Sequence, residues 1–331
     1  MRQTAVLSLV LAGAITSGTS AFAADPNLLN LVMPDAKVLA GVNVTSARIS
    51  PLGQFVISKI GLVGQEPQQF FAATGFNPLQ DVTEILAATS ADPTNPGGLI
   101  LASGTFSVDK ITAALAGKTN LQVQSYGGAI LIVATDAKAN VTHAVAFFGT
   151  TLAIAGDITS VKAAIDRKTN PTSIDAALAV KVNQLSGSED EWLISTASIA
   201  ALLPAGAGAG ATGPAAQVLP LFKSIQGFSG GVKFGDSVAF TGEAVATTAQ
   251  NASALEAVIK LGLALVSSNS AAVAKDPVLA QVIPLLQNLQ VTTKDAAVDL
   301  ALSIPEAQIE ALVNSAQAAN IKPVAATRMS K

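Results

Sequence analysis

The sequence predicts an α+β protein made of two similar halves, each a mainly antiparallel sheet with helices packed on one face. Three observations predict this fold. Short segments with alternating apolar residues recur along the chain, separated by turn residues. Four of these segments run directly into a helix that starts at a good N-cap residue. The four units fall in two pairs, which favours duplicated halves over a solenoid of short repeats.

The clearest unit spans residues 145–168. Gly149 stands at the first central position of a predicted two-residue loop, where glycine suits a tight hairpin turn. Asp157 follows the second strand segment, and its carboxylate can accept hydrogen bonds from N–H groups two and three residues later. Val161 and Ile165 then lie on one face of the predicted helix. The hairpin and the helix can therefore share one core.

Two other units show the same order of strand, cap and helix. In residues 99–115, Ser107 takes the place of Asp157 as the predicted N-cap. In the last unit, Ser303 and Glu306 form an S-x-x-E capping box, and the proline between them falls in the first turn, where its missing N–H is not needed. The pattern predicts that the final helix begins directly after Ser303.

An export signal is predicted at the start of the chain. Arg2 precedes an apolar run, and Ala21-Phe22-Ala23 is an A-x-A cleavage motif, so the mature protein is expected to begin at Ala24 in the periplasm or outside the cell. The apolar run is too short for a membrane anchor. The predicted segments are a signal peptide at 1–23, a first half at 24–185, a linker at 186–190, a second half at 191–315 and a flexible tail at 316–331.

The composition excludes several classes of function. The chain has no cysteine, which excludes a lipid-modified cysteine, thiolate metal sites and disulfides. Its net charge of -3 and its lack of basic clusters argue against nucleic-acid binding. After the signal, the longest apolar candidate, residues 255–266, is interrupted by Glu256 and Lys260. It is predicted to be a buried helix, so the mature chain is expected to hold no transmembrane segment.

Catalytic candidates are few. His143 is the only histidine, so any histidine-based general-base mechanism would depend on it, yet a strand residue with local hydrogen bonds is the favoured interpretation. Ser107 and Lys110 have the S-x-x-K spacing of serine acyltransferases, but the companion S-D-N and K-T-G motifs are absent. The N-cap interpretation of Ser107 is therefore preferred, and a Ser-Lys hydrolase is kept as an alternative.

Binding candidates are also sparse, and neither a cofactor nor a metal is predicted. Three carboxylates in residues 188–191 can be proposed as Ca²⁺ ligands, but they lack a D-x-D-x-D-G loop, and a solvated linker is favoured. Phe70, Phe71 and Phe76 cluster near the end of a predicted helix. They are expected to belong to a core, and they are the candidate lining of an apolar ligand site if the sheet is left uncovered.

A family resemblance rests on short motifs. Residues 73–89 (ATGFNPLQDVTEILAAT) and 33–44 (MPDAKVLAGVNV) resemble exported bacterial proteins of unknown function with two duplicated α+β halves. The AIAGD and SVKAAID motifs in residues 153–166 are similar to the end of the first half of those proteins. The resemblance implies a secreted two-repeat fold and transfers no catalytic residue. The insert AGAGAGATGP at 205–214 departs from the pattern.

The leading hypothesis is an exported, non-enzymatic binding or structural protein whose partner is an unknown protein or an apolar ligand. It rests on one histidine, no cysteine, sparse charge and motifs that capping and turns explain. The first alternative is a carrier of apolar ligands such as lipid, which requires a cavity of several hundred cubic ångström. The second alternative is a Ser-Lys hydrolase centred on Ser107.

Overall fold

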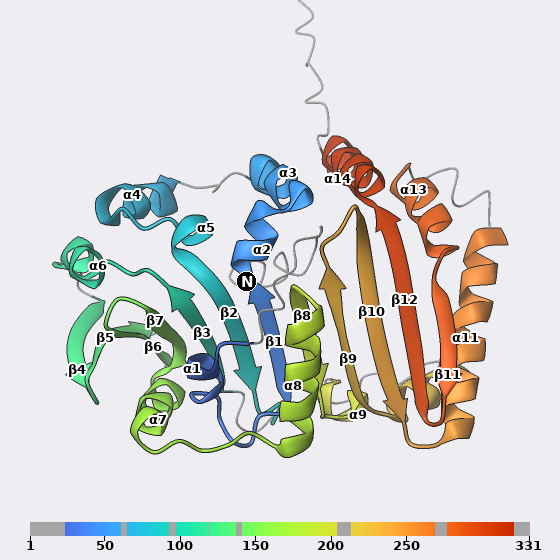
Figure 1. Cartoon of the computed structure of the whole chain (residues 1–331), viewed down its shortest axis with the longest axis horizontal. Coiled ribbons are helices and arrows are strands. Elements are labelled where there is room, and N and C mark those ends of the chain that lie inside the picture. The colour runs from blue at the N-terminus through green and yellow to red at the C-terminus, as the bar shows by residue number, and fades with distance from the viewer. Residues whose placement is uncertain are drawn as a thin grey trace, which may run out of the picture.

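One antiparallel sheet organises the protein. The computed structural model describes residues 24–60, 65–92, 97–118, 120–136, 141–203, 213–268 and 277–320. Their strands form a single twelve-stranded sheet in the order β11-β12-β10-β9-β8-β1-β2-β3-β7-β6-β5-β4 (Figure 1). The predicted α+β fold with a mainly antiparallel sheet is therefore confirmed.

The strands are β1 (Val38–Asn43), β2 (Val82–Thr89), β3 (Gly98–Gly104), β4 (Leu121–Tyr126), β5 (Ala129–Asp136), β6 (Val141–Phe148), β7 (Leu152–Asp157), β8 (Glu191–Ser195), β9 (Ile225–Lys233), β10 (Ser237–Ala246), β11 (Gln290–Lys294) and β12 (Ala297–Pro305). The helices are α1 (Pro26–Leu29), α2 (Val44–Ile49), α3 (Pro51–Ile60), α4 (Gln65–Thr74), α5 (Pro78–Asp81), α6 (Val108–Leu115), α7 (Ile158–Thr169), α8 (Ala176–Ser188), α9 (Ile199–Leu202), α10 (Pro214–Lys223), α11 (Ala249–Ser268), α13 (Pro277–Leu286) and α14 (Glu306–Asn320).

The two expected halves each contribute a contiguous block of the sheet. Strands β1 to β7 form one block and β8 to β12 the other, and the blocks meet where β1 pairs with β8. The expected linker at 186–190 falls on the end of α8 and the residues before β8. That the halves are duplicates of each other stays a prediction.

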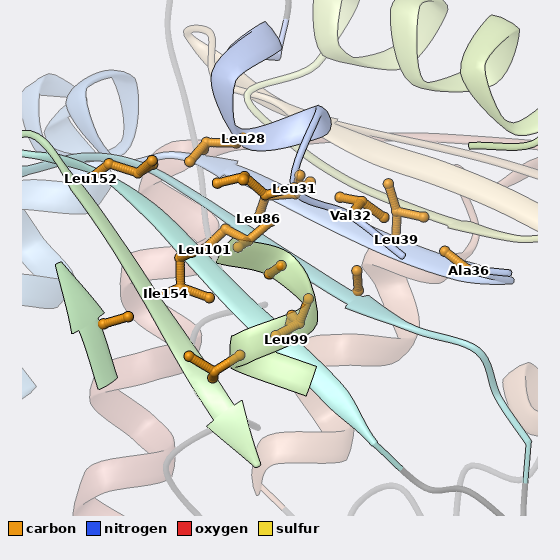
Figure 2. Close-up of a cluster of buried hydrophobic side chains, with 14 of the residues drawn as sticks. Leu28, Leu31, Val32, Ala36, Leu39, Leu86, Leu99, Leu101, Leu152 and Ile154 are labelled. Carbon is orange, nitrogen blue, oxygen red and sulfur yellow. The ribbon is translucent and has the colours of Figure 1, made fainter. Parts of the chain in front are cut away.

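Cross-strand register divides the sheet into two faces. We call face A the side that carries Leu39, Leu86, Leu101 and Ile154, and face B the opposite side. On face A these leucines and Ile154 form the largest buried cluster with Leu28 of α1 (Figure 2). Residues of α7 and α8 belong to the same cluster. This cluster holds the β1 to β7 block together from one side.

Face B is covered unevenly. Near β2, β3, β5 and β6, residues of α6 such as Ile111 pack against Ile132 and Phe147. In the β8 to β12 block, α3, α13 and α14 pack on one part of face B and α11 on another. The first block therefore has helices on both faces, α1, α7 and α8 on face A and α6 on face B, and not on one face as predicted.

The two predicted N-cap residues, Asp157 and Ser107, differ in the hydrogen bonds that they make. The Oδ1 atom of Asp157 accepts a hydrogen bond from the Ser160 N–H at 2.9 Å, which confirms the predicted N-cap of α7. Ser107 occupies the N-cap position of α6, but its hydroxyl makes no capping hydrogen bond.

The predicted two-residue hairpin loop is wrong by one residue, because Phe148 pairs with Leu152 and leaves three residues between them.

The predicted start of the last helix is also wrong. Ser303 and Pro305 belong to β12, and α14 begins at Glu306. Strand β10 reaches far enough for Ser237 to pair with Pro305, so the ladder takes the residues of the predicted capping box. Strand β11 pairs only up to Ala301, so Pro305 has a neighbouring strand on one side only, and proline is tolerated at such an edge position.

Helix α11 is more exposed than predicted. Only Ala252 and Leu255 are buried on it, and Leu261 and Leu265 are 59% and 60% exposed, so the expectation of a buried helix is wrong. Within the described ranges, α11 alone is long and apolar enough to cross a membrane by length and composition, a weak criterion that core helices of soluble proteins also meet.

Several predicted segments lie wholly or largely outside the described residues. These are the signal peptide at 1–23 and most of the insert at 205–214. Of the predicted tail at 316–331, residues up to Asn320 extend α14, and the rest lies outside the described residues.

Candidate functional site

An apolar groove of about 500 Å³ lies on face B of the first block. It is built around one row of successive cross-strand neighbours. Ala40 of β1 pairs with Ala87 of β2, which pairs with Ile100 of β3. Ile100 pairs with Ala155 of β7, which pairs with Val145 of β6. Five neighbouring strands therefore contribute one side chain each to the groove.

The groove is hollow because three of these five side chains are alanine methyl groups. Ile100 and Val145 stand above the alanines and are 39% and 36% exposed. The adjacent row on the same face, which includes Ile85 and Phe147, packs under the helices. On face B, one row of residues is therefore covered by helices, and the next row forms an open apolar surface.

Polar groups are rare in the groove. Its lining includes one hydroxyl side chain, Thr89, and one imidazole, His143, while the remaining residues are aliphatic or glycine. The full lining is Val38, Ala40, Ala87, Ala88, Thr89, Gly98, Leu99, Ile100, His143, Ala144, Val145, Ala155 and Gly156. Such a surface favours apolar ligands and gives little support for catalysis.

His143 lies at one end of the groove. It is exposed, and its cross-strand neighbour is Asp157. Burial acts to raise the pKa of the Asp157 carboxyl, but hydrogen bonds from Ser160 and neighbouring backbone N–H groups lower that pKa below its usual value. In the described part of the chain, no ion pair joins Asp157 to His143. Asp157 therefore acts as a helix cap.

A second concavity, of about 470 Å³, lies on face A beside α8. Val180 and Val245 contribute to it, but so does an ion pair in which Lys181 Nζ lies 2.6 Å from Glu243 Oε1. A bound apolar ligand would have to desolvate this pair. The groove on face B is therefore the better candidate for an apolar ligand.

The predicted ligand-lining phenylalanines belong to an aromatic series. The rings of Phe71 and Phe76 have centroids 6.5 Å apart. Phe76 and Phe106 are 5.9 Å apart, and Phe106 and Phe147 5.6 Å apart. Phe76, Phe106 and Phe147 pack in the core under α6, which accords with the expected core role. The side chain of Phe70 lies outside the described residues, and the ligand-lining role stays a prediction.

Ser107 and Lys110 do not form a catalytic pair in this structure. Among the hydrogen bonds of the described residues, none joins the two side chains, and both residues are exposed. The Nζ atom of Lys110 lies instead beside Gly75, 3.8 Å from the place of a Cβ atom there. The hydrogen bond by which a lysine activates a serine is therefore missing.

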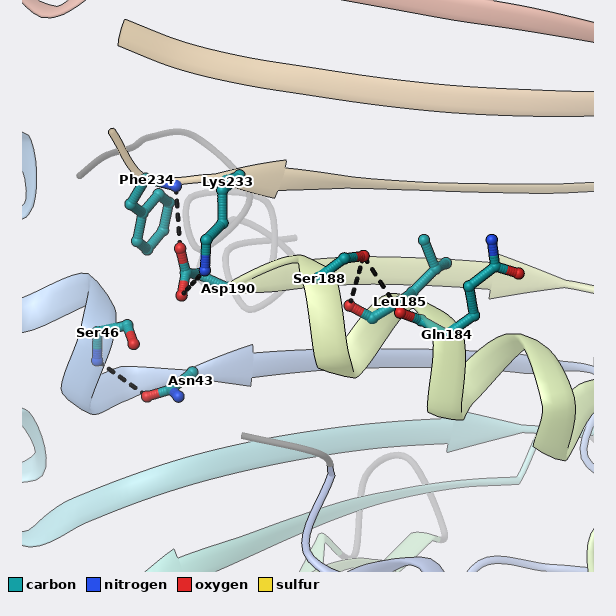
Figure 3. A network of polar contacts seen from close by, with 8 residues as sticks. All are labelled: Asn43, Ser46, Gln184, Leu185, Ser188, Asp190, Lys233 and Phe234. Carbon is teal, nitrogen blue, oxygen red and sulfur yellow. Dashed lines mark hydrogen bonds and ion pairs between the residues drawn. The ribbon is translucent and has the colours of Figure 1, made fainter. Parts of the chain in front are cut away.

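The three carboxylates at 189–191 point to different partners. Glu189 accepts a hydrogen bond from Thr241 at 3.0 Å. Asp190 accepts hydrogen bonds from Lys233 at 3.1 Å and from the backbone N–H of Phe234 at 2.9 Å (Figure 3). Glu191 is buried on face B. Within the described ranges, no group of three or more acidic or histidine residues could hold a metal ion.

Sequence reasoning missed the groove residues. The available signal was the alternation of β7, in which Ala153 and Ala155 face away from the buried Leu152 and Ile154. It gave no information that β3 lies on the other side of β7.

Comparisons with known proteins add a structural likeness. No family model matches the chain, and no curated protein matches it. Crystal form IV of TP0453, a Treponema pallidum protein, has a TM-score of 0.50 at 9% identity, covering 86% of this chain and 95% of that one. The fold resembles that of TP0453.

Two other crystal forms of TP0453 are similar to the chain. Form III has a TM-score of 0.49 at 8% identity, covering 87% of this chain and 97% of that one. Form I has a TM-score of 0.47 at 9% identity, covering 89% and 99%. At these identities the likeness concerns the fold alone, so the function has to be argued from the groove.

Proposed function

We propose that the protein is an exported, non-enzymatic binding protein that holds an apolar, chain-like ligand, such as the acyl chain of a lipid, in the face B groove. The observation that carries the proposal is the row of Ala40, Ala87, Ile100, Ala155 and Val145 across five strands. The groove volume of about 500 Å³ falls within the range of known small-molecule sites.

The chemistry of the lining favours a flexible aliphatic ligand. Methyl and branched aliphatic groups offer apolar contact without an aromatic platform, so they give no preference for flat ring systems. Burial of apolar surface contributes about 25 cal/mol per Å², and no polar group has to be matched along the row. His143 at one end is the group that would meet a polar or anionic headgroup.

The absence of enzymatic activity is part of the proposal. Ser107 lacks a hydrogen bond to Lys110. His143 lies beside Asp157, whose carboxylate caps a helix, and the only hydroxyl side chain in the groove lining is that of Thr89. Neither arrangement provides an activated nucleophile. Export is supported by the A-x-A motif that ends at Ala23.

A groove-filling substitution tests the proposal. Ala87→Phe places a ring between Ala40 and Ile100, and we expect it to weaken binding of a fluorescent fatty acid by about tenfold or more, since the ring takes the ligand's place. Binding is measured by titration of the mature protein.

Val123→Phe is the matched control. Val123 is exposed on the edge strand β4 and does not line the groove, so this variant should bind like the wild type. Circular dichroism establishes that both variants are folded. Equal affinity of the Ala87→Phe variant and the wild type, or no binding by the wild type, would contradict the proposal.

A further inference from the structure

The first described residues of the chain are fixed to the sheet. Ala24 is 5% exposed and belongs to the largest buried cluster. The backbone N–H of Asp25 donates to both carboxylate oxygens of Glu84, at 3.2 Å and 3.1 Å. The side chain of Asp25 is engaged with the first turn of α1, where its Oδ1 accepts from the Asn27 N–H at 2.8 Å. Ala24 therefore lies one residue before a direct contact with the Glu84 carboxylate.

Within the described ranges, Glu84 has no cationic partner. It is half-buried on β2, and no lysine or arginine forms an ion pair with it in the described part of the chain. Burial and, to a lesser extent, the Asp25 carboxylate raise the pKa of Glu84 to about 7, against the lowering effect of the hydrogen bond from the Asp25 N–H. Lys168 lines the same concavity as Asp25, but its ammonium lies over the ring of Phe148 at 4.9 Å.

We propose that Glu84 is the binding site for the N-terminal ammonium group that cleavage between Ala23 and Ala24 creates. This inference rests on the export part of the proposed function and is independent of the groove ligand. Hydrolysis adds one water across the peptide bond, which leaves a carboxylate on Ala23 and an amine on Ala24. The amine takes up a proton and becomes an ammonium one residue before the N–H that already donates to Glu84.

The geometry and the charge both suit this role. Consecutive Cα atoms are about 3.8 Å apart, so the new ammonium stays close to the carboxylate without rearrangement of α1. The ammonium supplies the positive charge that Glu84 lacks, and hydrogen bonds between charged groups are stronger than neutral ones. The precursor has a neutral amide at this position, so only the cleaved chain gains the ion pair.

The pH dependence follows from the signs of the two shifts. The pair raises the pKa of the α-amino group above its usual value of about 8, so its contribution is present below that value and lost as pH rises through the raised pKa. In turn, the ammonium lowers the pKa of Glu84 relative to the chain without it. The ion pair should therefore contribute most to the stability of the mature protein at pH values between the usual pKa of a carboxyl group and the usual pKa of an amine.

A double-mutant cycle tests the proposal with the mature chain that begins at Ala24. The N-terminus is changed by chemical acetylation or by one added glycine, and Glu84 by Glu84→Gln. We expect either change at the N-terminus to raise the unfolding equilibrium constant by about tenfold at pH 7 in the wild type and to change it little in Glu84→Gln. Glu243→Gln, which alters a carboxylate paired with Lys181, is the control and should keep the full effect.

Two results would overturn the proposal. One is an effect of acetylation that is equal in Glu84→Gln and in the wild type, or absent from both. The other is an exported protein whose first residue, determined by N-terminal sequencing, is not Ala24. If Glu84→Gln does not fold, the reactivity of the wild-type α-amine decides the question. It should react at pH 8 about tenfold more slowly in the native than in the unfolded protein, because an ion-paired amine stays protonated, and equal rates would refute the ion pair.

Discussion

Gly41→Ala should destabilise the protein by about 3 kcal/mol or more, because the new methyl group overlaps a buried indole ring. Gly41 lies in β1 and pairs with Trp192 of β8, and a Cβ atom at Gly41 would lie 2.6 Å from the Trp192 Nε1 atom. Trp192 is buried at the junction of the two sheet blocks, so its ring has little room to move. Urea unfolding followed by the fluorescence of this single tryptophan measures the effect.

Gly187→Ala is the matched control for this substitution. Gly187 lies in α8, and a Cβ atom there would meet no atom within 4 Å apart from its chain neighbours and the nearby backbone of its own helix. Alanine should stabilise the helix by up to about 1 kcal/mol, since glycine loses more backbone entropy on folding. A Gly41→Ala variant as stable as the wild type would show that β1 and β8 are not paired in this register.

Glu191 should make the protein less stable as pH rises. Its side chain is buried between Val42 and Val232, and one carboxylate oxygen, Oε2, has no hydrogen-bond partner. Burial raises the pKa of Glu191 to about 8, and the neighbouring Asp190 carboxylate raises it as well. The folded state therefore keeps a proton that the unfolded state releases at neutral pH.

The sign of this shift fixes the pH window. The contribution of Glu191 is fully present below the ordinary glutamate pKa of about 4.5 and is lost as pH rises to about 8. The loss is on the order of 5 kcal/mol. Glu191→Gln stays neutral at every pH, so this loss should be absent from the variant. The variant should be as stable as the wild type at the acidic end of the window and more stable than the wild type at the alkaline end.

Unfolding free energies across this pH range measure the effect. Asp109→Asn, which changes an exposed carboxylate of α6, should keep the loss of stability with rising pH that Glu191 causes. Parallel profiles for Glu191→Gln and the wild type would mean that Glu191 is solvated and ionised in the folded protein.

Local signals in the sequence predicted the elements that depend on local contacts. Asp157 and the spacing of Val161 and Ile165 correctly placed α7 and its buried face. The capping box at Ser303 failed because Ser237 and its neighbours in β10 offered backbone partners to β12, which the local pattern could not indicate. Tertiary pairing thus outweighed the local signal.

The groove was not predictable, because it depends on strand order. Alternation in the sequence shows that Ala155 and Val145 face away from the buried side of their strands. It does not show that β3 lies beside β7 or that β1 lies between β2 and β8. These non-local pairings align Ala40, Ala87 and Ile100 with Ala155 and so create the apolar row.

Native mass spectrometry of the protein isolated from its own host tests the central claim most directly. The wild type should carry an apolar molecule of lipid mass that is released on unfolding, and Ala87→Phe isolated in the same way should carry much less of it. Val123→Phe should retain it at the wild-type level. Wild-type protein that is free of bound lipid, or Ala87→Phe loaded as fully as the wild type, would contradict the assignment of the face B groove as a binding site.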